Sequence, residues 1–112
     1  MTATTLDEAT NDKSLVMTSS LTNLVLAARF LGLLRQPDRY QEVCEHLSGI
    51  ASDVINRHLG TIAQVAKAPR VLFLGGGSHF AGAREAALKM LGMTAGRVST
   101  MGESYLGLRH VP

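Results

Sequence analysis

The chain has 112 residues, of which 46% are hydrophobic and only 4% aromatic, with one cysteine and a formal net charge of +2. This is the length of one small domain, and a single cysteine excludes an internal disulfide bond. The weak charge, with no run of three basic residues, excludes the basic footprint of a nucleic-acid-binding protein. We therefore expect no nucleic-acid partner and a reducing, cytoplasmic location.

The first 13 residues are polar and are predicted to be disordered, because they offer too little apolar surface to offset the entropy cost of ordering. They lack the apolar stretch of a signal peptide. The longest uncharged apolar stretch, Leu24 to Ala28, is far shorter than the about 20 residues of a membrane-spanning helix. We expect no membrane partner.

Two helices are predicted next. Ser14 to Met17 is a short apolar run that fits the end of a strand, and the hydroxyls of Thr18 to Ser20 fit a helix cap. Apolar residues then recur every three or four positions from Leu21 to Leu34, which predicts a largely buried helix. Pro37 suits the first turn of the following helix.

The second helix is predicted from Asp38 to Ala66 and has the clearest helical periodicity of the chain. Unbroken, it would be about 43 Å long, whereas a compact domain of this size has a radius of gyration of about 13 Å. The helix must therefore either bend at Gly60 or extend beyond one compact body, as a connector between two lobes would.

A strand, a turn and a third helix follow. Arg70 to Leu74 is a continuous apolar run, which predicts a strand covered on both faces. Gly75 to Ser78 reads as a turn, and the helical pattern returns from His79 to Met93.

Gly96 is predicted to end that helix, Arg97 to Met101 to form a second strand, and Gly102 to Pro112 to be loop or short helix. A strand, helix and strand in this order make one right-handed βαβ unit. Two strands do not complete a stable parallel sheet, so we expect either a partner chain to complete it or the sequence to be a piece of a longer one.

The glycine turn Gly75 to Ser78 stands where backbone N–H groups and a helix N-terminus can hold an anion, although such turns also serve simple chain reversal. The sequence matches no dinucleotide fingerprint, since Phe80 replaces the small residue that the pattern needs. It also matches neither a P-loop nor the nucleophile elbow of hydrolases.

No metal site is expected. Cys44 and His46 are two residues apart, so about 200° separates them around a helix, and His58 lies about 18 Å further along from His46. Cys44 reads as a buried core residue. Glu85 and Lys89 have the spacing of an ion pair within one helix.

Three strings carry a resemblance: R-E-A-A-L-K-M-L from Arg84 to Leu91, T-A-G-R-V from Thr94 to Val98, and the segment from Glu103 to His110. They resemble the sugar isomerase (SIS) family, and most closely its tagatose-6-phosphate ketose/aldose isomerase or galactosamine-6-phosphate deaminase branch. That branch has R-E-x-A-L-K-x-L-E-L-T-A-G-K and then D-S-x-x-G-x-R-H-G-P. Met17 to Thr22 also resembles the M-T-S-S-F-T segment that closes the first SIS lobe.

The resemblance implies a partial SIS fold of the α/β class. We expect a flavodoxin-like three-layer αβα architecture, represented here by one βαβ unit preceded by two long helices. Residues 14–36 would end the first lobe, 37–68 would form the connector helix, and 69–112 would begin a truncated second lobe. The family is two-lobed and oligomeric, which implies a homo-oligomer or a complementing chain.

The resemblance also implies site residues for a phosphosugar substrate and no cofactor. His110 matches the ring-opening histidine and Lys89 a conserved active-site lysine. The further residues that would contact substrate are the glycine-turn residues, one α-helical carboxylate and the Glu-Ser pair in place of Asp-Ser: Gly76, Gly77, Ser78, Glu85, Glu103 and Ser104.

Three family features are absent. The catalytic base, a Glu one turn beyond the lysine, is replaced by Gly92, and the glycine of H-G-P is replaced by Val111. The phosphate loop of the first lobe has no counterpart in the sequence. Loss of a positioned proton-transfer group costs about two to four orders of magnitude in rate.

Three functions are left open by these observations. In the first alternative, the chain is an isomerase or deaminase that is active only when other chains supply the missing parts. In the second, it is a non-catalytic module that binds a phosphosugar. The third alternative is a truncated interaction fragment without a ligand.

Overall fold

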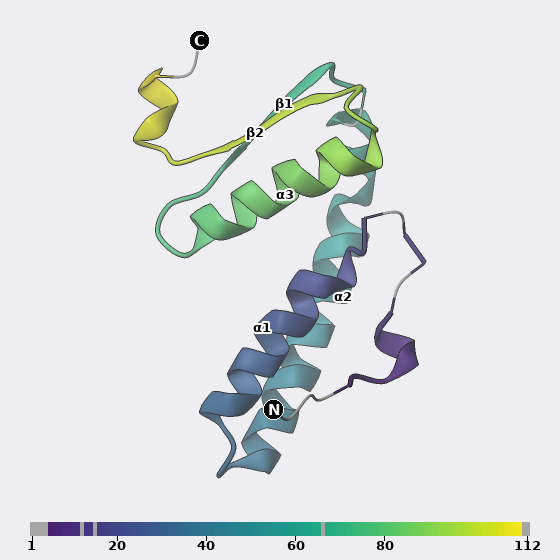
Figure 1. Cartoon of the computed structure of the whole chain (residues 1–112), viewed down its shortest axis with the longest axis vertical. Coiled ribbons are helices and arrows are strands. Elements are labelled where there is room, and N and C mark those ends of the chain that lie inside the picture. Colours follow the sequence, from purple (N-terminus) through teal and green to yellow (C-terminus); the bar gives the residue numbers. More distant parts are fainter. Residues whose placement is uncertain (1–4, 12, 15, 66, 111–112) are drawn as a thin grey trace. The chain divides into compact units, whose positions relative to one another are not determined.

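The computed structural model describes residues 5–11, 13–14, 16–65 and 67–110. Seven elements follow one another: η1 (Glu8–Thr10), α1 (Ser19–Gly32), α2 (Pro37–Val65), β1 (Arg70–Leu74), α3 (His79–Met93), β2 (Ser99–Glu103) and η2 (Gly107–His110), where η denotes a 3-10 helix (Figure 1). They divide into two compact units, residues 1–60 and 61–112. The mixture of helices with a parallel strand pair confirms the α/β class.

The second unit is built on a βαβ motif, as predicted. Strands β1 and β2 pair in parallel, with Val71 opposite Thr100 and Phe73 opposite Gly102. Helix α3 connects the two strands and lies along one face of their sheet (Figure 1). Both β1 and α3 begin and end at the predicted residues.

Small residues hold α3 close to the sheet. Ala83 and Ala87 are buried on the helix, and the Thr100 hydroxyl donates a hydrogen bond of 2.8 Å to the Ala87 carbonyl. A Cβ added at Gly102 would lie 2.6 Å from the Arg84 Cα, a distance that no real side chain tolerates. The two backbones can approach this closely only because residue 102 is glycine.

The opposite face of the sheet is open, so the prediction of a strand covered on both faces is wrong for residues 61–112. Leu72, Leu74 and Met101 are 38%, 37% and 45% exposed, while Val71 and Phe73 are half-buried. The apolar run of β1 is two-sided, but α3 covers only one side. This unit therefore has two layers, and the third layer of a flavodoxin-like arrangement stays a prediction.

Strand β2 begins two residues later than the predicted Arg97 to Met101 segment. The shift has a local cause, because Arg97 and Val98 belong to the turn that closes α3. The Arg97 N–H donates to the Thr94 carbonyl over 3.0 Å. Gly96, at φ +77°, donates to the Leu91 carbonyl over 2.9 Å and ends the helix as predicted.

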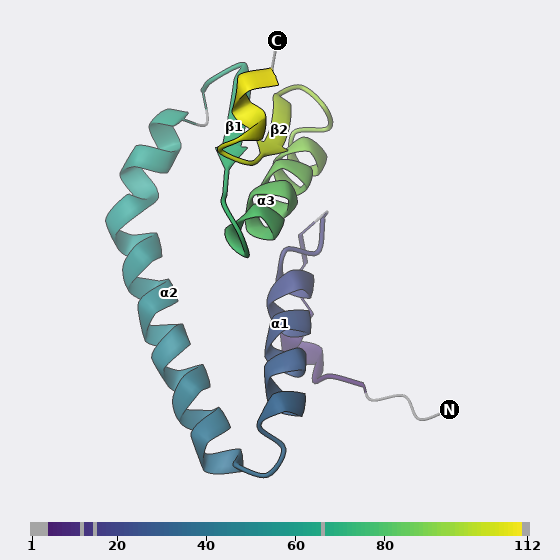
Figure 2. The ribbon, with the colours of Figure 1, turned by 90° about the vertical axis from the view of Figure 1, so that its left-hand side faces the viewer.

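In the first unit, α1 and the first part of α2 form an antiparallel helical hairpin (Figure 2). Its closed end is held by an edge-to-face contact between the rings of Phe30 and Tyr40, whose centroids are 5.2 Å apart. The Tyr40 hydroxyl also donates a 3.3 Å hydrogen bond to the Leu26 carbonyl.

An apolar groove of about 700 Å³ lies between the two helices, further from this closed end. Residues from both helices line it, among them Leu21, Val25, Leu47 and Val54. The helix predicted to be largely buried contains no buried residue, since α2 covers only one side of α1. Cys44 is half-buried rather than buried, and its hydrogen bond to Tyr40 raises the pKa of the Tyr40 phenol.

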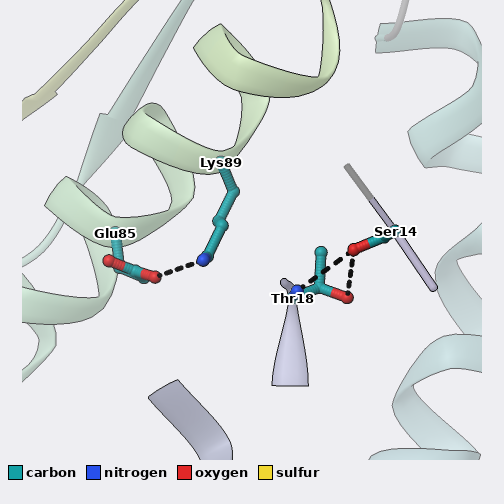
Figure 3. A network of polar contacts seen from close by, with 4 residues as sticks. All are labelled: Ser14, Thr18, Glu85 and Lys89. Atoms are coloured by element: carbon teal, nitrogen blue, oxygen red, sulfur yellow. Dashed lines mark hydrogen bonds and ion pairs between the residues drawn. The ribbon is translucent and has the colours of Figure 1, made fainter. Parts of the chain in front are cut away.

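The start of α1 differs from the sequence prediction. Ser14, Val16 and Met17 are not in a strand, and Leu15 lies outside the described residues. The Thr18 side chain makes no capping hydrogen bond. Instead the Ser14 hydroxyl accepts the Thr18 N–H over 3.2 Å (Figure 3).

Within the N-terminal segment predicted to be disordered, the structure describes a short helix. Residues 8–10 form η1, and the Asp7 carboxylate accepts the Ala9 N–H over 2.8 Å at its start. The Thr10 carbonyl accepts hydrogen bonds from the Ser19 hydroxyl and the Asn23 amide of α1, at 2.9 and 3.2 Å. These contacts connect the described part of the N-terminal segment to α1. Amino-acid composition does not predict them.

The long helix forms as predicted. Pro37 is the first residue of α2, and the helix continues through Gly60 to Val65. The boundary between the two units falls directly after Gly60. The role of the helix as a connector between lobes, and the predicted division of the chain into lobe segments, stay predictions.

Candidate functional site

The two strands of the second unit place most of the predicted site residues at one edge. Gly76, Gly77 and Ser78 follow the carboxyl end of β1, and Glu103 and Ser104 stand at the carboxyl end of β2. The Gly75 N–H donates to the Glu103 carbonyl over 3.1 Å, which joins the two strand ends. In open α/β sheets, ligands bind at the carboxyl ends of parallel strands.

The glycine turn is tightly constrained. A Cβ at Gly75 would overlap the His79 carbonyl group and lie 2.8 Å from the Phe80 nitrogen, so β1 can enter α3 this closely only through glycine. Gly77 has a φ of +55°, which few side chains tolerate. These two glycines serve the chain reversal, which is one of the two alternatives for this turn.

An anion bound at this turn would compete with internal hydrogen bonds for the backbone N–H groups. The His79 and Phe80 N–H groups donate to the carbonyls of Gly76 and Gly77, at 3.1 and 3.2 Å. An anion at the start of α3 would have to replace these turn bonds or use other donors. Ser78 is exposed there and makes no capping hydrogen bond, so its hydroxyl faces no such competition from the helix end.

Glu103 and Ser104 shape the chain that follows β2. The Glu103 carboxylate accepts the Ser104 N–H over 2.7 Å, and the Ser104 hydroxyl accepts the Gly107 N–H over 2.9 Å. A Cβ at Gly107 would overlap the Glu103 carboxylate, so glycine leaves room for this side chain. Both predicted contact residues thus build the turn into η2.

Glu85 and Lys89 form the predicted ion pair within α3, with Nζ and Oε1 3.2 Å apart (Figure 3). Each stands two residues after a buried alanine, Ala83 and Ala87, and is therefore about 200° around the helix from the sheet-facing side. The ion pair consequently lies on the face of α3 that points away from the sheet. Residues 61–112 do not bring it together with the residues at the strand ends.

Two further predicted positions lie on the same elements. Gly92 is three residues beyond Lys89 in the last turn of α3, so a side chain there would share the face of the ion pair. His110 is the last residue of η2, and its side chain lies outside what the structure describes.

Tyr105 is a residue of this edge that the sequence analysis missed. A Cβ at Gly76 would lie 3.3 Å from the Tyr105 Cδ2, so the ring rests against the glycine turn. Tyr105 occupies a variable position of the family pattern, which is why motif matching overlooks it. The available signal was an aromatic residue shortly after a predicted strand, in a chain with only two tyrosines.

The described residues contain no candidate for a metal centre or a membrane span. No three His, Cys, Asp or Glu side chains among them are grouped so as to hold a metal ion. None of the described helices is both long and apolar enough to span a bilayer.

Comparison with known proteins relates the chain to aminosugar-phosphate enzymes. It is 40% identical over 111 residues to the D-galactosamine-6-phosphate deaminase AgaS of Shewanella sp. (strain ANA-3), covering 96% of this chain and 27% of that protein. It is 30% identical over 105 residues to the D-galactosamine-6-phosphate deaminase AgaS of Escherichia coli O157:H7, covering 92% of this chain and 27% of that protein.

The chain thus spans about a quarter of the length of these relatives. No protein-family model matches it, and no solved structure matches it. The similarity extends over nearly all of this chain.

Proposed function

We propose that this chain is part of a sugar-phosphate deaminase or ketose/aldose isomerase of the SIS family, with an aminosugar phosphate such as galactosamine 6-phosphate as substrate. The observation that carries the proposal is 40% identity across 96% of the chain to a protein named for that activity. The clustering of Gly76, Ser78 and Ser104 at the carboxyl ends of two parallel strands supports it, because ligands bind at such edges.

The chemistry assigns a task to each predicted residue. Isomerisation moves a proton between C1 and C2 of the open-chain sugar, so the ring must open first, and His110 is proposed to assist this step. In the deamination, the same proton shift converts the C2 amine to an imine. Water then adds to C2, ammonia leaves, and a ketose phosphate remains. Lys89, paired with Glu85 over 3.2 Å, lies on the face of α3 away from the strand ends, so its proposed role as an active-site lysine requires a part of the site that residues 61–112 do not supply.

Gly92 favours a second candidate function, binding without turnover. Where the family pattern has its catalytic base this chain has no side chain at all, so the proton between C1 and C2 lacks its acceptor. A non-catalytic module that binds a phosphosugar would keep Ser78, Ser104 and the glycine turn while dispensing with the carboxylate. We expect the chain on its own to show no measurable turnover.

An activity assay separates these alternatives. The full chain is incubated with galactosamine 6-phosphate or tagatose 6-phosphate, and released ammonia or the isomerised sugar is measured. Gly92→Glu should raise the rate by about two to four orders of magnitude if a missing base is the defect. Gly92→Gln is the matched control, because its side chain has a similar shape but cannot accept the proton.

The outcomes are distinct. Activity in Gly92→Glu but not in Gly92→Gln supports the enzyme proposal. Binding of galactosamine 6-phosphate, seen as a raised thermal midpoint, without activity in either variant supports the binding module. No product and no shift at millimolar ligand contradicts both and leaves the interaction fragment.

We also propose that a second copy or a complementing chain completes the sheet, in a cytoplasmic oligomer. Leu72, Leu74 and Met101 form an exposed apolar face on the β1–β2 pair, and parallel sheets occur almost only with both faces covered. Light scattering should report a species larger than one chain. A monomer with a sharp, cooperative melt would contradict this.

A further inference from the structure

The backbone around Tyr105 is held in place from both sides. Before it, the Glu103 carboxylate accepts the Ser104 N–H over 2.7 Å. After it, the Ser104 hydroxyl accepts the Gly107 N–H over 2.9 Å, and the Ser104 carbonyl accepts the Leu108 N–H over 3.0 Å. Tyr105 is therefore a residue of a defined turn.

The ring itself is placed but not buried. Its Cδ2 and Cε2 atoms would lie 3.3 and 3.5 Å from a Cβ added at Gly76, so one part of the ring touches the glycine turn. Even so, Tyr105 is 64% exposed. Most of its surface is therefore available to a ligand at this edge.

The ring lies near the carboxyl ends of both strands. Tyr105 directly follows Ser104 after β2, and its ring contacts Gly76, two residues before Ser78 after β1. It is thus an exposed aromatic surface that rests on the glycine turn at the edge where a ligand would bind. Small-molecule sites commonly combine such an aromatic surface with a few polar groups.

A sugar phosphate presents two kinds of surface to such a site. Its phosphate and hydroxyl groups need hydrogen-bond partners, whereas its C–H bonds can pack on the electron-rich face of an aromatic ring. We propose that Tyr105 contacts the carbon skeleton of the sugar phosphate and determines the preference for a sugar phosphate over inorganic phosphate; this inference rests on the proposed function.

Binding measurements on the full chain test the inference. Affinities for galactosamine 6-phosphate and for inorganic phosphate are compared in the unsubstituted chain, Tyr105→Phe and Tyr105→Ala. Tyr105→Ala should weaken binding of the sugar phosphate about fivefold and leave that of inorganic phosphate within about twofold. Tyr105→Phe keeps the ring and should retain the affinity for the sugar phosphate.

An optical readout locates the ligand at the ring. Tyr40 and Tyr105 are the two tyrosines of a chain without tryptophan, so in Tyr40→Phe the tyrosine emission comes from Tyr105 alone. Titration of Tyr40→Phe with galactosamine 6-phosphate should change that emission. The ligand concentration at half of the change should agree with the dissociation constant from the affinity measurement. Far-UV circular dichroism of each variant checks that the fold is kept.

The results separate the inference from the function on which it rests. If galactosamine 6-phosphate binds equally well to Tyr105→Ala, or if Tyr105→Ala weakens both ligands alike, the role of Tyr105 is wrong and the proposed function stands. If galactosamine 6-phosphate does not bind the unsubstituted chain at all, both are overturned.

Discussion

The helical hairpin of residues 1–60 and the βαβ unit of residues 61–112 carry similar apolar patterns but use them differently. In the βαβ unit, Ala83 and Ala87 are buried at 7% exposure, and glycines allow the helix and strands to touch. In the hairpin, Leu24 and Leu31 remain 69% and 67% exposed. Periodicity predicts the helix in both cases, but it does not predict whether a partner surface covers it.

The difference lies in which residues make the contacts. Alanine and glycine at the contact let α3 lie close to the sheet, so close backbone packing holds the βαβ unit together. Large side chains line the hairpin groove, and the Phe30–Tyr40 ring contact at its closed end holds the helices. We therefore expect substitutions to cost most where they add an atom between α3 and the strands.

Gly102→Ala is the largest expected effect. Its Cβ would lie 2.6 Å from the Arg84 Cα and 2.7 Å from the Ala83 carbonyl oxygen, and neither backbone atom can rotate away. We expect a loss of about 3 kcal/mol in the free energy of unfolding, the upper end for overpacking. Urea denaturation followed by circular dichroism measures it, and hydrogen exchange of the β1–β2 amides localises it.

Gly82→Ala is the matched control for that substitution. Gly82 lies in α3, and a Cβ there meets nothing within 4 Å, so alanine should stabilise the helix by up to about 1 kcal/mol. If both variants changed stability in the same direction, close packing of α3 on the sheet would not be the basis of the βαβ unit.

Phe30→Leu tests the hairpin and should have a smaller effect. It removes the edge-to-face contact with Tyr40, whose ring centroid is 5.2 Å away, and such contacts contribute about 1 kcal/mol. Chemical denaturation monitored by tyrosine emission reports the loss. Leu31→Ala is the control and should change stability by no more than about 0.5 kcal/mol, because that side chain is 67% exposed. Equal losses would mean that the Leu31 side chain is covered in solution and that the ring contact is not what holds the hairpin.

Much of the fold could be predicted from local patterns. The bounds of β1 and α3, the parallel pairing and the start of α2 at Pro37 follow from periodicity, glycine and proline. What could not be predicted depends on contacts between distant residues. The hydrogen bonds of the Thr10 carbonyl with Ser19 and Asn23 join residues that are 9 and 13 positions apart, and composition alone does not predict them.

The candidate site shows the same limit. Topology alone places Gly76, Ser78 and Ser104 at one edge, because parallel strands end together. The separation of the Glu85–Lys89 pair from that edge depends on which face of α3 packs on the sheet, and small residues at 83 and 87 decide this. The contact of Tyr105 with Gly76 depends on the turn after β2, which no spacing rule describes.

Gly60→Ala is the smallest expected effect and tests the boundary between the two units. Gly60 lies inside α2, and a Cβ there meets nothing within 4 Å, so alanine should raise the free energy of unfolding by about 0.5 to 1 kcal/mol. Denaturation of the full chain measures this, and Gly96→Ala is the opposing control, because its φ of +77° makes alanine destabilising there. A loss of stability in Gly60→Ala would mean that α2 needs the conformational freedom of glycine at this point. Of the two alternatives for this long helix, the bend at Gly60 would then be the correct one in solution.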